Sequence, residues 1–282
     1  MPKCSNDSMK MYPVKKDEEV YQISRELREP LQKPPFVYCY AGSRGTGKTN
    51  ALINEMLMGW GYGDMPNCDP VFNDMYIFSS TLGCDSTSRF LVQRATMCFS
   101  SYDDSMVDMI LESQKAKEKK DRRHILIICD DFGAGLLKPN ASIFKLCSVH
   151  RHYLISICFL YQSARMIPPV VRSCMTALHL YRIPNAKEQE KVFEDLCFLG
   201  DKSMVQDLYD YATEKPYHLL FVDCIQMTAH KWGACEPEFL FSKYTESGGY
   251  SPNFVNPNRQ RGTRKQRERL KEIEDLQEED DK

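Results

Sequence analysis

An eight-residue run, GSRGTGKT at residues 42–49, constrains this chain more than any other feature of its sequence. The run matches G-x-x-x-x-G-K-[ST] at every required position, and it lies between a short apolar run and a helical pattern. Glycines let the backbone turn so that several N–H groups point at one anion, and a following helix adds positive potential there. The run therefore predicts a phosphate-binding loop between a buried strand over residues 36–40 and a helix over residues 48–58.

The residue types of this loop indicate a nucleoside triphosphate bound with magnesium. Lys48 can place a positive charge on the β- and γ-phosphates, and the Thr49 hydroxyl can ligate Mg²⁺. The chain lacks the N-K-x-D run that reads guanine in GTPases, so ATP is the expected nucleotide. We expect the nucleotide to contact Gly42, Ser43, Arg44, Gly45, Thr46, Gly47, Lys48, Thr49 and Asn50.

Two acids follow the most apolar run of the chain, HILIIC at residues 124–129. At the tip of a buried strand, Asp130 could hold the magnesium through water, and Asp131 could polarise the attacking water as a general base. Aspartates after strands also serve in turns and helix caps. Together with the loop upstream, the tandem acids favour ATP hydrolysis over a small-molecule kinase.

Apolar runs alternate with helical patterns along most of the chain. Strands are predicted over residues 75–79, 96–100, 124–129, 155–161 and 176–183, and helices over residues 106–120, 142–149, 186–199 and 203–213. Residues 217–225 and 226–232 could pair as a final hairpin, and residues 16–29 could form an amphipathic helix. This order predicts an α/β fold, a three-layer P-loop NTPase of the RecA-like (ASCE) kind with a central, mostly parallel sheet.

Composition divides the chain into three predicted parts. These are an N-terminal extension (residues 1–34), an ATPase domain (residues 35–243) and a charged tail (residues 244–282) that we expect to be disordered. The tail carries seven basic residues between Arg259 and Lys271 and then seven acidic ones, so its basic half either contacts nucleic acid or is merely solvated. The net charge of −2 gives no global attraction for nucleic acid. No apolar run is long enough for a membrane span, and we expect an intracellular protein.

A more specific pattern lies around the strand predicted over residues 155–161. Arg151 precedes this strand and Gln162 stands at its tip, within RHYLISICFLYQ. Together with AGSRGTGKTN, IICDD and IPPVVRS, this pattern resembles the FtsK–HerA superfamily of DNA pumps. Within that superfamily the chain looks like the poxvirus-type DNA-packaging ATPases of large DNA viruses and virophages. The resemblance covers about residues 36–183.

The resemblance implies a ring, as a hexamer, with ATP held between neighbouring subunits. Arg151 would reach into the neighbour's site as a finger, with Arg172 as the alternative candidate, and Gln162 would sense the γ-phosphate. Many proteins of this group carry glutamate as the second acid, where this chain has the shorter Asp131.

The implied function is ATP-driven translocation of double-stranded DNA into a preformed capsid, with a capsid or portal-vertex protein as a partner. The expected location is the host cytoplasm or a viral factory, with virion association as a further option. Two alternatives stay open. One is a DNA helicase or segregation pump of the same superfamily, and the other is a nucleotide-gated capsid assembly protein that binds ATP with negligible turnover.

Overall fold

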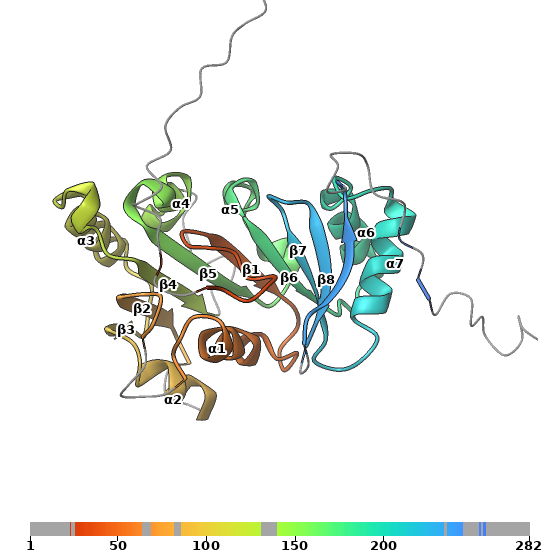
Figure 1. Cartoon of the computed structure of the whole chain (residues 1–282), viewed down its shortest axis with the longest axis horizontal. Coiled ribbons are helices and arrows are strands. Elements are labelled where there is room, and N and C mark those ends of the chain that lie inside the picture. Colours follow the sequence, from red (N-terminus) through yellow and green to blue (C-terminus); the bar gives the residue numbers. More distant parts are fainter. Residues whose placement is uncertain are drawn as a thin grey trace, which may run out of the picture.

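The computed structural model describes residues 23, 26–63, 69–81, 86–130, 140–233, 236–244, 254, 256 and 257. Within this part of the chain, nine strands form one sheet. The strands are β1 (Val37–Ala41), β2 (Asp74–Ser79), β3 (Met97–Phe99), β4 (Ile125–Asp130), β5 (Ile155–Tyr161), β6 (Ala177–Tyr181), β7 (Leu219–Asp223), β8 (Thr228–Trp232) and β9 (Glu238–Ser242). Their order is β3-β2-β4-β5-β1-β6-β7-β8-β9 (Figure 1). β1 to β6 run parallel, whereas β7, β8 and β9 pair antiparallel. The predicted α/β fold with a mostly parallel sheet is confirmed.

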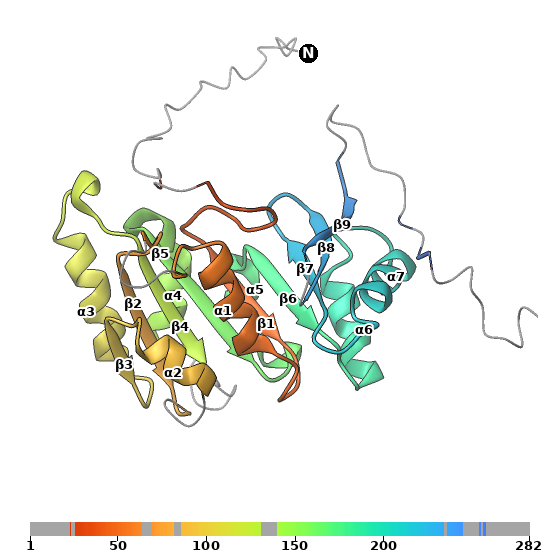
Figure 2. The ribbon, with the colours of Figure 1, turned by 60° about the horizontal axis from the view of Figure 1, so that its bottom comes forward.

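Helices cover both faces of the sheet, which gives three layers (Figures 1 and 2). One face carries α1 (Lys48–Met58) and α2 (Ser86–Val92). The other carries α3 (Asp104–Lys115), α4 (Ser142–Val149), α5 (Pro169–Cys174), α6 (Ala186–Asp195) and α7 (Lys202–Ala212). None of the described helices has the length and hydropathy that a membrane-spanning helix requires.

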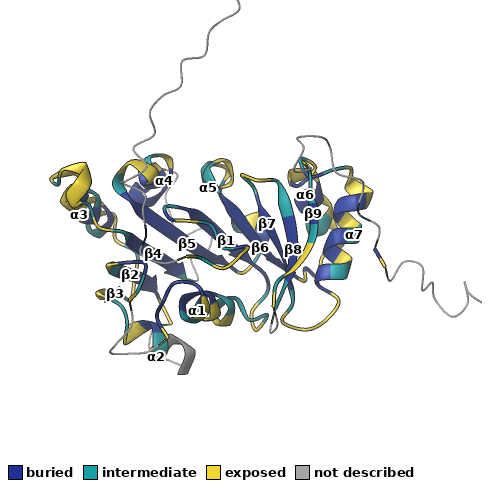
Figure 3. Cartoon of the chain, in the orientation of Figure 1, coloured by how far each residue is buried: buried dark blue, intermediate teal, exposed yellow. Residues whose placement is uncertain are grey.

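The sheet separates two hydrophobic cores, because successive side chains of a strand point to opposite faces. In β1, Val37 and Cys39 belong to the core under α3 to α7, whereas Tyr38 and Tyr40 belong to the core under α1 and α2. Every residue of β1 is buried, and so is every residue of β5, β6 and β7 (Figure 3). Burial on both faces explains why these strands read as continuous apolar runs.

Local capping sets several helix boundaries. The side chain of Asp103 accepts a hydrogen bond from the Ser105 amide and begins α3. The predicted helix over residues 106–120 therefore begins earlier, and it ends at Lys115. The predicted bounds are confirmed for α1, α4 and β5, and β7 and β8 pair as the predicted hairpin.

Other elements differ from the sequence prediction. The predicted helix over residues 16–29 is wrong in its described part, where residues 26–28 are irregular and a turn follows. Pro30 disfavours helical geometry in the residue before it, and Leu27 packs instead against the core under α1. Trp60 and Tyr62, which follow α1, are buried. The sequence prediction missed α2, α5 and β9.

A buried carboxylate joins α1 to two strands. Glu55 of α1 is 1% exposed. Its Oε2 accepts a hydrogen bond of 2.6 Å from the hydroxyl of Tyr40 in β1. Its Oε1 lies 2.8 Å from Nε2 of His179 in β6, and the imidazole of His179 stacks on the Tyr40 ring. This contact fixes α1 against the middle of the sheet.

We expect Glu55→Ala to lower the free energy of unfolding by about 3–5 kcal/mol, because removing one member of a buried polar pair leaves its partners unsatisfied. Urea denaturation followed by circular dichroism measures the change. Glu112→Ala is the matched control, because Glu112 forms an exposed pair with Lys115 on α3 and its loss should change stability little. Equal stability of the two variants would show that the Glu55 contact does not hold α1.

Candidate active site

The parallel strands bring several of the predicted site residues to one end of the sheet, which we call its carboxyl end. β1 leads into the phosphate loop (residues 42–49), β4 ends at Asp130, and Gln162 follows β5. Ala41 pairs with Tyr161, and Asp130 pairs with Leu160. Since β5 lies between β1 and β4, the backbones of Asp130 and the start of the phosphate loop are about 10 Å apart. This is room for a phosphate and a metal between them.

Glycines shape the phosphate loop at three positions. Gly45 and Gly47 have φ angles of 79° and 96°, in the left-handed region that L side chains rarely adopt. Gly42 is required for space, because a Cβ there would lie 2.6 Å from Cβ of Tyr181 and 2.8 Å from Oγ1 of Thr46. Gly47 directly precedes α1, so the N-terminus of this helix faces the loop.

Two neighbouring strands anchor the phosphate loop. The Gly42 amide donates a hydrogen bond of 3.2 Å to the Tyr161 carbonyl at the end of β5. The Tyr181 hydroxyl, at the end of β6, donates one of 3.2 Å to the Gly47 carbonyl. Burial raises the pKa of Tyr181, and Glu55 raises it further, so the hydroxyl stays protonated and remains a donor.

Two charged groups at the carboxyl end of the sheet, those of Lys48 and Asp130, have hydrogen-bond partners within the protein. The Lys48 ammonium donates hydrogen bonds to the carbonyls of Gly42 (2.8 Å) and Ser43 (3.0 Å), so its charge lies against the loop's own backbone. Asp130 Oδ2 accepts a hydrogen bond of 3.3 Å from Ser79 Oγ, which stands opposite it on β2. The Thr49 hydroxyl, in the first turn of α1, makes no hydrogen bond to any described residue.

Three further predicted site residues are exposed, and a fourth lies outside the described residues. Arg44, Asn50 and Gln162 are exposed. Asp131 lies in the segment 131–139, outside the described residues, so its role as the base stays a prediction. The sequence analysis missed Ser79 and Tyr181. Ser79 could have been found as a polar residue at a strand end, whereas Tyr181 reads as one more apolar strand residue.

Arg151 lies at the opposite, amino end of the sheet. It belongs to a short turn, η3 (His150–Tyr153), that precedes β5. The seven residues of β5 span about 20 Å, so Arg151 is remote from the phosphate loop of its own chain. Arg151 is exposed and makes no hydrogen bond or ion pair to the described residues. It lines a hollow of 1020 Å³, the amino-end hollow, together with Gln226 and Phe239.

Arg172 has a different environment from Arg151. Its guanidinium forms an ion pair of 2.8 Å with Asp195 of α6, and both side chains are about half exposed. This ion pair links α5 to α6 on the outside of the molecule. A guanidinium that already has an acidic partner is less available to a phosphate.

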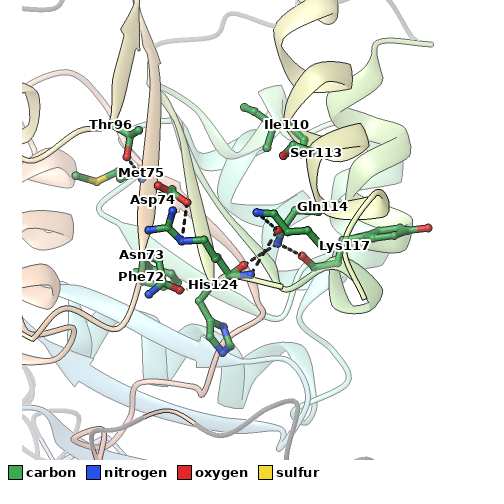
Figure 4. A network of polar contacts seen from close by, with 12 residues as sticks. Phe72, Asn73, Asp74, Met75, Thr96, Ile110, Ser113, Gln114, Lys117 and His124 are labelled. Carbon is green, nitrogen blue, oxygen red and sulfur yellow. Dashed lines mark hydrogen bonds and ion pairs between the residues drawn. The ribbon is translucent and has the colours of Figure 1, made fainter. Parts of the chain in front are cut away.

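The side-chain amide of Gln114 fixes the segment that carries Arg151, and Figure 4 shows the polar contacts around Gln114. The Gln114 side chain of α3 is fully buried, and its Nε2 donates hydrogen bonds of 2.7 Å to the carbonyls of Arg123 and Tyr153. Arg123, before β4, also forms an ion pair of 3.3 Å with Asp74 at the start of β2. These contacts hold α3, β4 and η3 in one arrangement.

His150 is the buried residue beside Arg151. Its Nδ1 lies 2.7 Å from the Cys147 carbonyl of α4. Burial lowers the pKa of His150 to about 4, although the hydrogen bond to Cys147 acts in the opposite direction. The imidazole is therefore neutral at pH 7 and can donate from Nδ1 to that carbonyl.

We expect Gly42→Ala to destabilise the protein by about 1–3 kcal/mol, because the added Cβ overlaps the Tyr181 side chain at the end of a buried strand. Thermal unfolding measures this change. In Gly63→Ala the nearest atom to the new Cβ is 3.6 Å away, so this control should unfold like the original protein. A Gly42→Ala protein as stable as the Gly63→Ala protein would contradict the tight contact.

We expect stability to fall as the pH is lowered from about 6.5 to about 4. In this window the unfolded chain protonates His150, whereas the folded chain keeps it neutral, so its contribution is fully present above pH 6.5 and is lost below. The total loss from this residue is about 3 kcal/mol. Urea denaturation of His150→Gln between pH 7 and pH 4.5 should show a shallower pH dependence than the original protein. The exposed neighbour supplies the control, His152→Gln, whose slope should not change.

Several solved structures align with this chain at low sequence identity. The genome packaging NTPase B204 of Sulfolobus turreted icosahedral virus 2, in complex with AMP, aligns with a TM-score of 0.48 at 14% identity, covering 70% of this chain and 96% of B204. EssC of Geobacillus thermodenitrificans aligns with a TM-score of 0.47 at 13% identity, covering 67% of this chain and 38% of EssC. At TM-scores below 0.5, these likenesses carry no conclusion about the present chain.

Sequence comparison gives a firmer result. The DNA packaging protein OPG160 of variola virus is 28% identical over 160 residues, which are 55% of this chain and 56% of OPG160. A second variola virus isolate gives the same figures. The match thus spans little more than half of the length of these relatives. The family model described as Poxvirus A32 protein matches residues 24–213, which is more than half of the chain. The chain therefore belongs to the Poxvirus A32 protein family.

Proposed function

We propose that this chain is an ATPase that drives double-stranded viral DNA into a preformed capsid. One observation carries the proposal: a chain of the Poxvirus A32 protein family gathers a phosphate loop, Asp130 and Gln162 at one end of a parallel sheet. The name of the variola virus relative, a DNA packaging protein, supports the same function for this chain.

ATP would enter with its phosphates inside the phosphate loop. The turn at Gly45 and Gly47 and the N-terminus of α1 offer backbone N–H donors to the β-phosphate. The Lys48 ammonium, which donates to carbonyls of its own loop, would exchange them for phosphate oxygens. Arg44 and Asn50 flank the loop as exposed residues at which the nucleotide could make further contacts.

Magnesium fits the donors on this side of the sheet. The Thr49 hydroxyl and the Asp130 carboxylate are hard oxygen ligands, and a metal held by one or two such groups keeps several waters. Mg²⁺ would neutralise charge that develops on the transferred phosphate. Ser79 orients the Asp130 carboxylate through a hydrogen bond of 3.3 Å. In this proposal Asp131 accepts a proton from the attacking water, and Gln162 contacts the γ-phosphate.

Arg151 would act on the ATP of a neighbouring subunit. Its position at the amino end of the sheet, about 20 Å from the carboxyl end, excludes contact with the phosphates of its own chain. A ring, proposed as a hexamer, would bring the amino end of one sheet against the carboxyl end of the next. There the Arg151 guanidinium, which forms no ion pair with a described residue, could stabilise the transferring phosphate, an effect worth about 10³–10⁵ in rate.

The proposed partners follow from the task of a packaging motor. Contacts to double-stranded DNA should go to its backbone, because a translocating motor must pass any sequence, and binding should weaken steeply with salt. A capsid or portal-vertex protein would hold the ring in place. The proposed setting is the cytoplasm or viral factory of an infected cell, with association with the virion.

Steady-state ATP hydrolysis with and without double-stranded DNA tests the proposal. We expect DNA to stimulate turnover and Lys48→Ala to abolish it. Arg151→Ala should bind ATP but lose about 10³-fold or more in turnover. Lys120→Ala, which removes an exposed charge on the turn before β4, is the matched control and should hydrolyse ATP normally.

Mixing the two inactive variants tests the ring directly. A Lys48→Ala subunit has an intact finger and an Arg151→Ala subunit has an intact phosphate loop, so mixed rings should regain part of the turnover. No recovery would argue against a finger that acts between subunits. ATP binding without turnover, and indifference to DNA, would instead indicate a nucleotide-gated assembly protein. Strand displacement by the purified protein would indicate a helicase.

A further inference from the structure

The order of the strands determines which way a nucleotide must lie, provided that the phosphate loop binds ATP as proposed above. Asp130 stands on β4, on one side of β1, so the γ-phosphate and its metal face β4 and β5. In a nucleoside triphosphate, the base lies at the opposite end of the molecule from the γ-phosphate. The base must therefore leave the phosphate loop on the opposite side of β1, over the ends of β6, β7 and β8.

A hollow of 240 Å³, which we call the base hollow, lies at that place. It begins beside Gly47, the last loop residue before α1. Three aromatic residues line it, Tyr181 at the end of β6, Tyr217 before β7 and Trp232 at the end of β8. Trp232 packs edge-on against the buried Phe221, so this wall of the hollow is rigid. Aromatic walls beside a phosphate site suit a flat heterocycle.

Tyr217 is an exposed aromatic residue with an unfavourable backbone conformation. Its side chain is 63% exposed, and its hydroxyl makes no hydrogen bond to the described residues. Its φ angle of 65° lies in the left-handed region, which is unfavourable for a bulky residue. The ring stands over the loop, because a Cβ on Gly47 would lie 3.3 Å from Cδ1 of Tyr217. Strained residues of this kind are concentrated at ligand clamps.

Two amides face the same hollow from α1. Asn50 and Asn54 are four residues apart, so they lie on one face of the helix, and both line the base hollow. Both are exposed, and neither side chain makes a hydrogen bond to the described residues. Asn50 is next to the phosphate loop, whereas Asn54 is one turn, about 6 Å, further along α1.

An amide group distinguishes the purines. Adenine presents an N–H donor at N6 beside the acceptor N7, which matches the acceptor and donor of one amide, whereas guanine presents two acceptors, O6 and N7. We propose that Tyr217 stacks on the base of the bound nucleotide and that Asn54 hydrogen-bonds its edge, which makes the site selective for adenine. Asn50 lies between the base and the phosphates and contacts the ribose.

A second hollow beside the Tyr217 ring offers an alternative position for the base. Tyr217 also lines a space of 320 Å³ on its other side, with Arg182 and Lys215 on the walls. Arginine and lysine pair with the two acceptors of guanine. A base on that side would therefore favour GTP and would be sensitive to Lys215 rather than to Asn54.

Equilibrium binding of ATP and GTP to the purified full chain, by isothermal titration calorimetry, tests the proposal without relying on turnover. Tyr217→Ala should weaken both nucleotides about 5- to 150-fold, because it removes one stacking contact, and Tyr217→Phe should bind like the original protein. Asn54→Ala should weaken ATP about 3- to 10-fold and GTP less. Phe239→Ala, which removes an equally exposed aromatic ring on β9, should change neither.

Three other outcomes would overturn the proposed base site. Tight ATP binding that Tyr217→Ala leaves unchanged would overturn the base site while leaving the proposed ATPase intact. A change of the ATP to GTP ratio in Lys215→Ala but not in Asn54→Ala would place the base on the other side of the ring and overturn the role of Asn54. If the original protein bound neither nucleotide, the proposed function itself would fail, and the base site with it. Tyr217 is exposed, so loss of folding is not a competing explanation for these variants.

Discussion

The buried carboxylate of Glu55 is the contact on which the geometry of the phosphate loop depends. A loop rich in glycine cannot hold its own shape, so its shape depends on the two elements that it joins and on its hydrogen bonds to β5 and β6. Glu55 ties α1 to β1 through Tyr40 and to β6 through His179, about two helical turns beyond Lys48 and Thr49. Burial of all three side chains away from water makes these contacts costly to break. The loop therefore sits on a rigid frame before any ligand arrives.

Most of the fold could be predicted from the sequence because its signals are local. Strand β5 reads as a continuous apolar run, and α1 begins where the glycines stop. The elements that were missed carry weaker signals: α2 and α5 are short, and β9 is an exposed edge strand in which burial leaves little pattern. The segment before Pro30 has helical spacing, yet Leu27 packs without forming a helix because tertiary contacts outweigh propensity.

The candidate site could be predicted in part for the same reason. Lys48, Thr49 and Asp130 belong to short motifs that can be recognised from residues that are adjacent in the sequence. Ser79 is a polar residue at a strand end, but only its pairing with Asp130 on β4 shows that it belongs to the site, and no local pattern indicates that Tyr217 lines the base hollow. The roles of Gln162 and Arg151 came from a resemblance. The structure places Arg151 at the far end of the sheet from the phosphate loop.

The hairpin of β7 and β8 touches two distant places at once. At one end, Leu219 and Trp232 line the base hollow, and at the other end Asp223 and Thr228 line the amino-end hollow beside Arg151. β7 is hydrogen-bonded to β6 on one side and to β8 on the other, so it cannot slide by less than a full step of register. One pair of hydrogen-bonded strands therefore forms part of the wall of both hollows, so a substitution within the hairpin can alter the two hollows together.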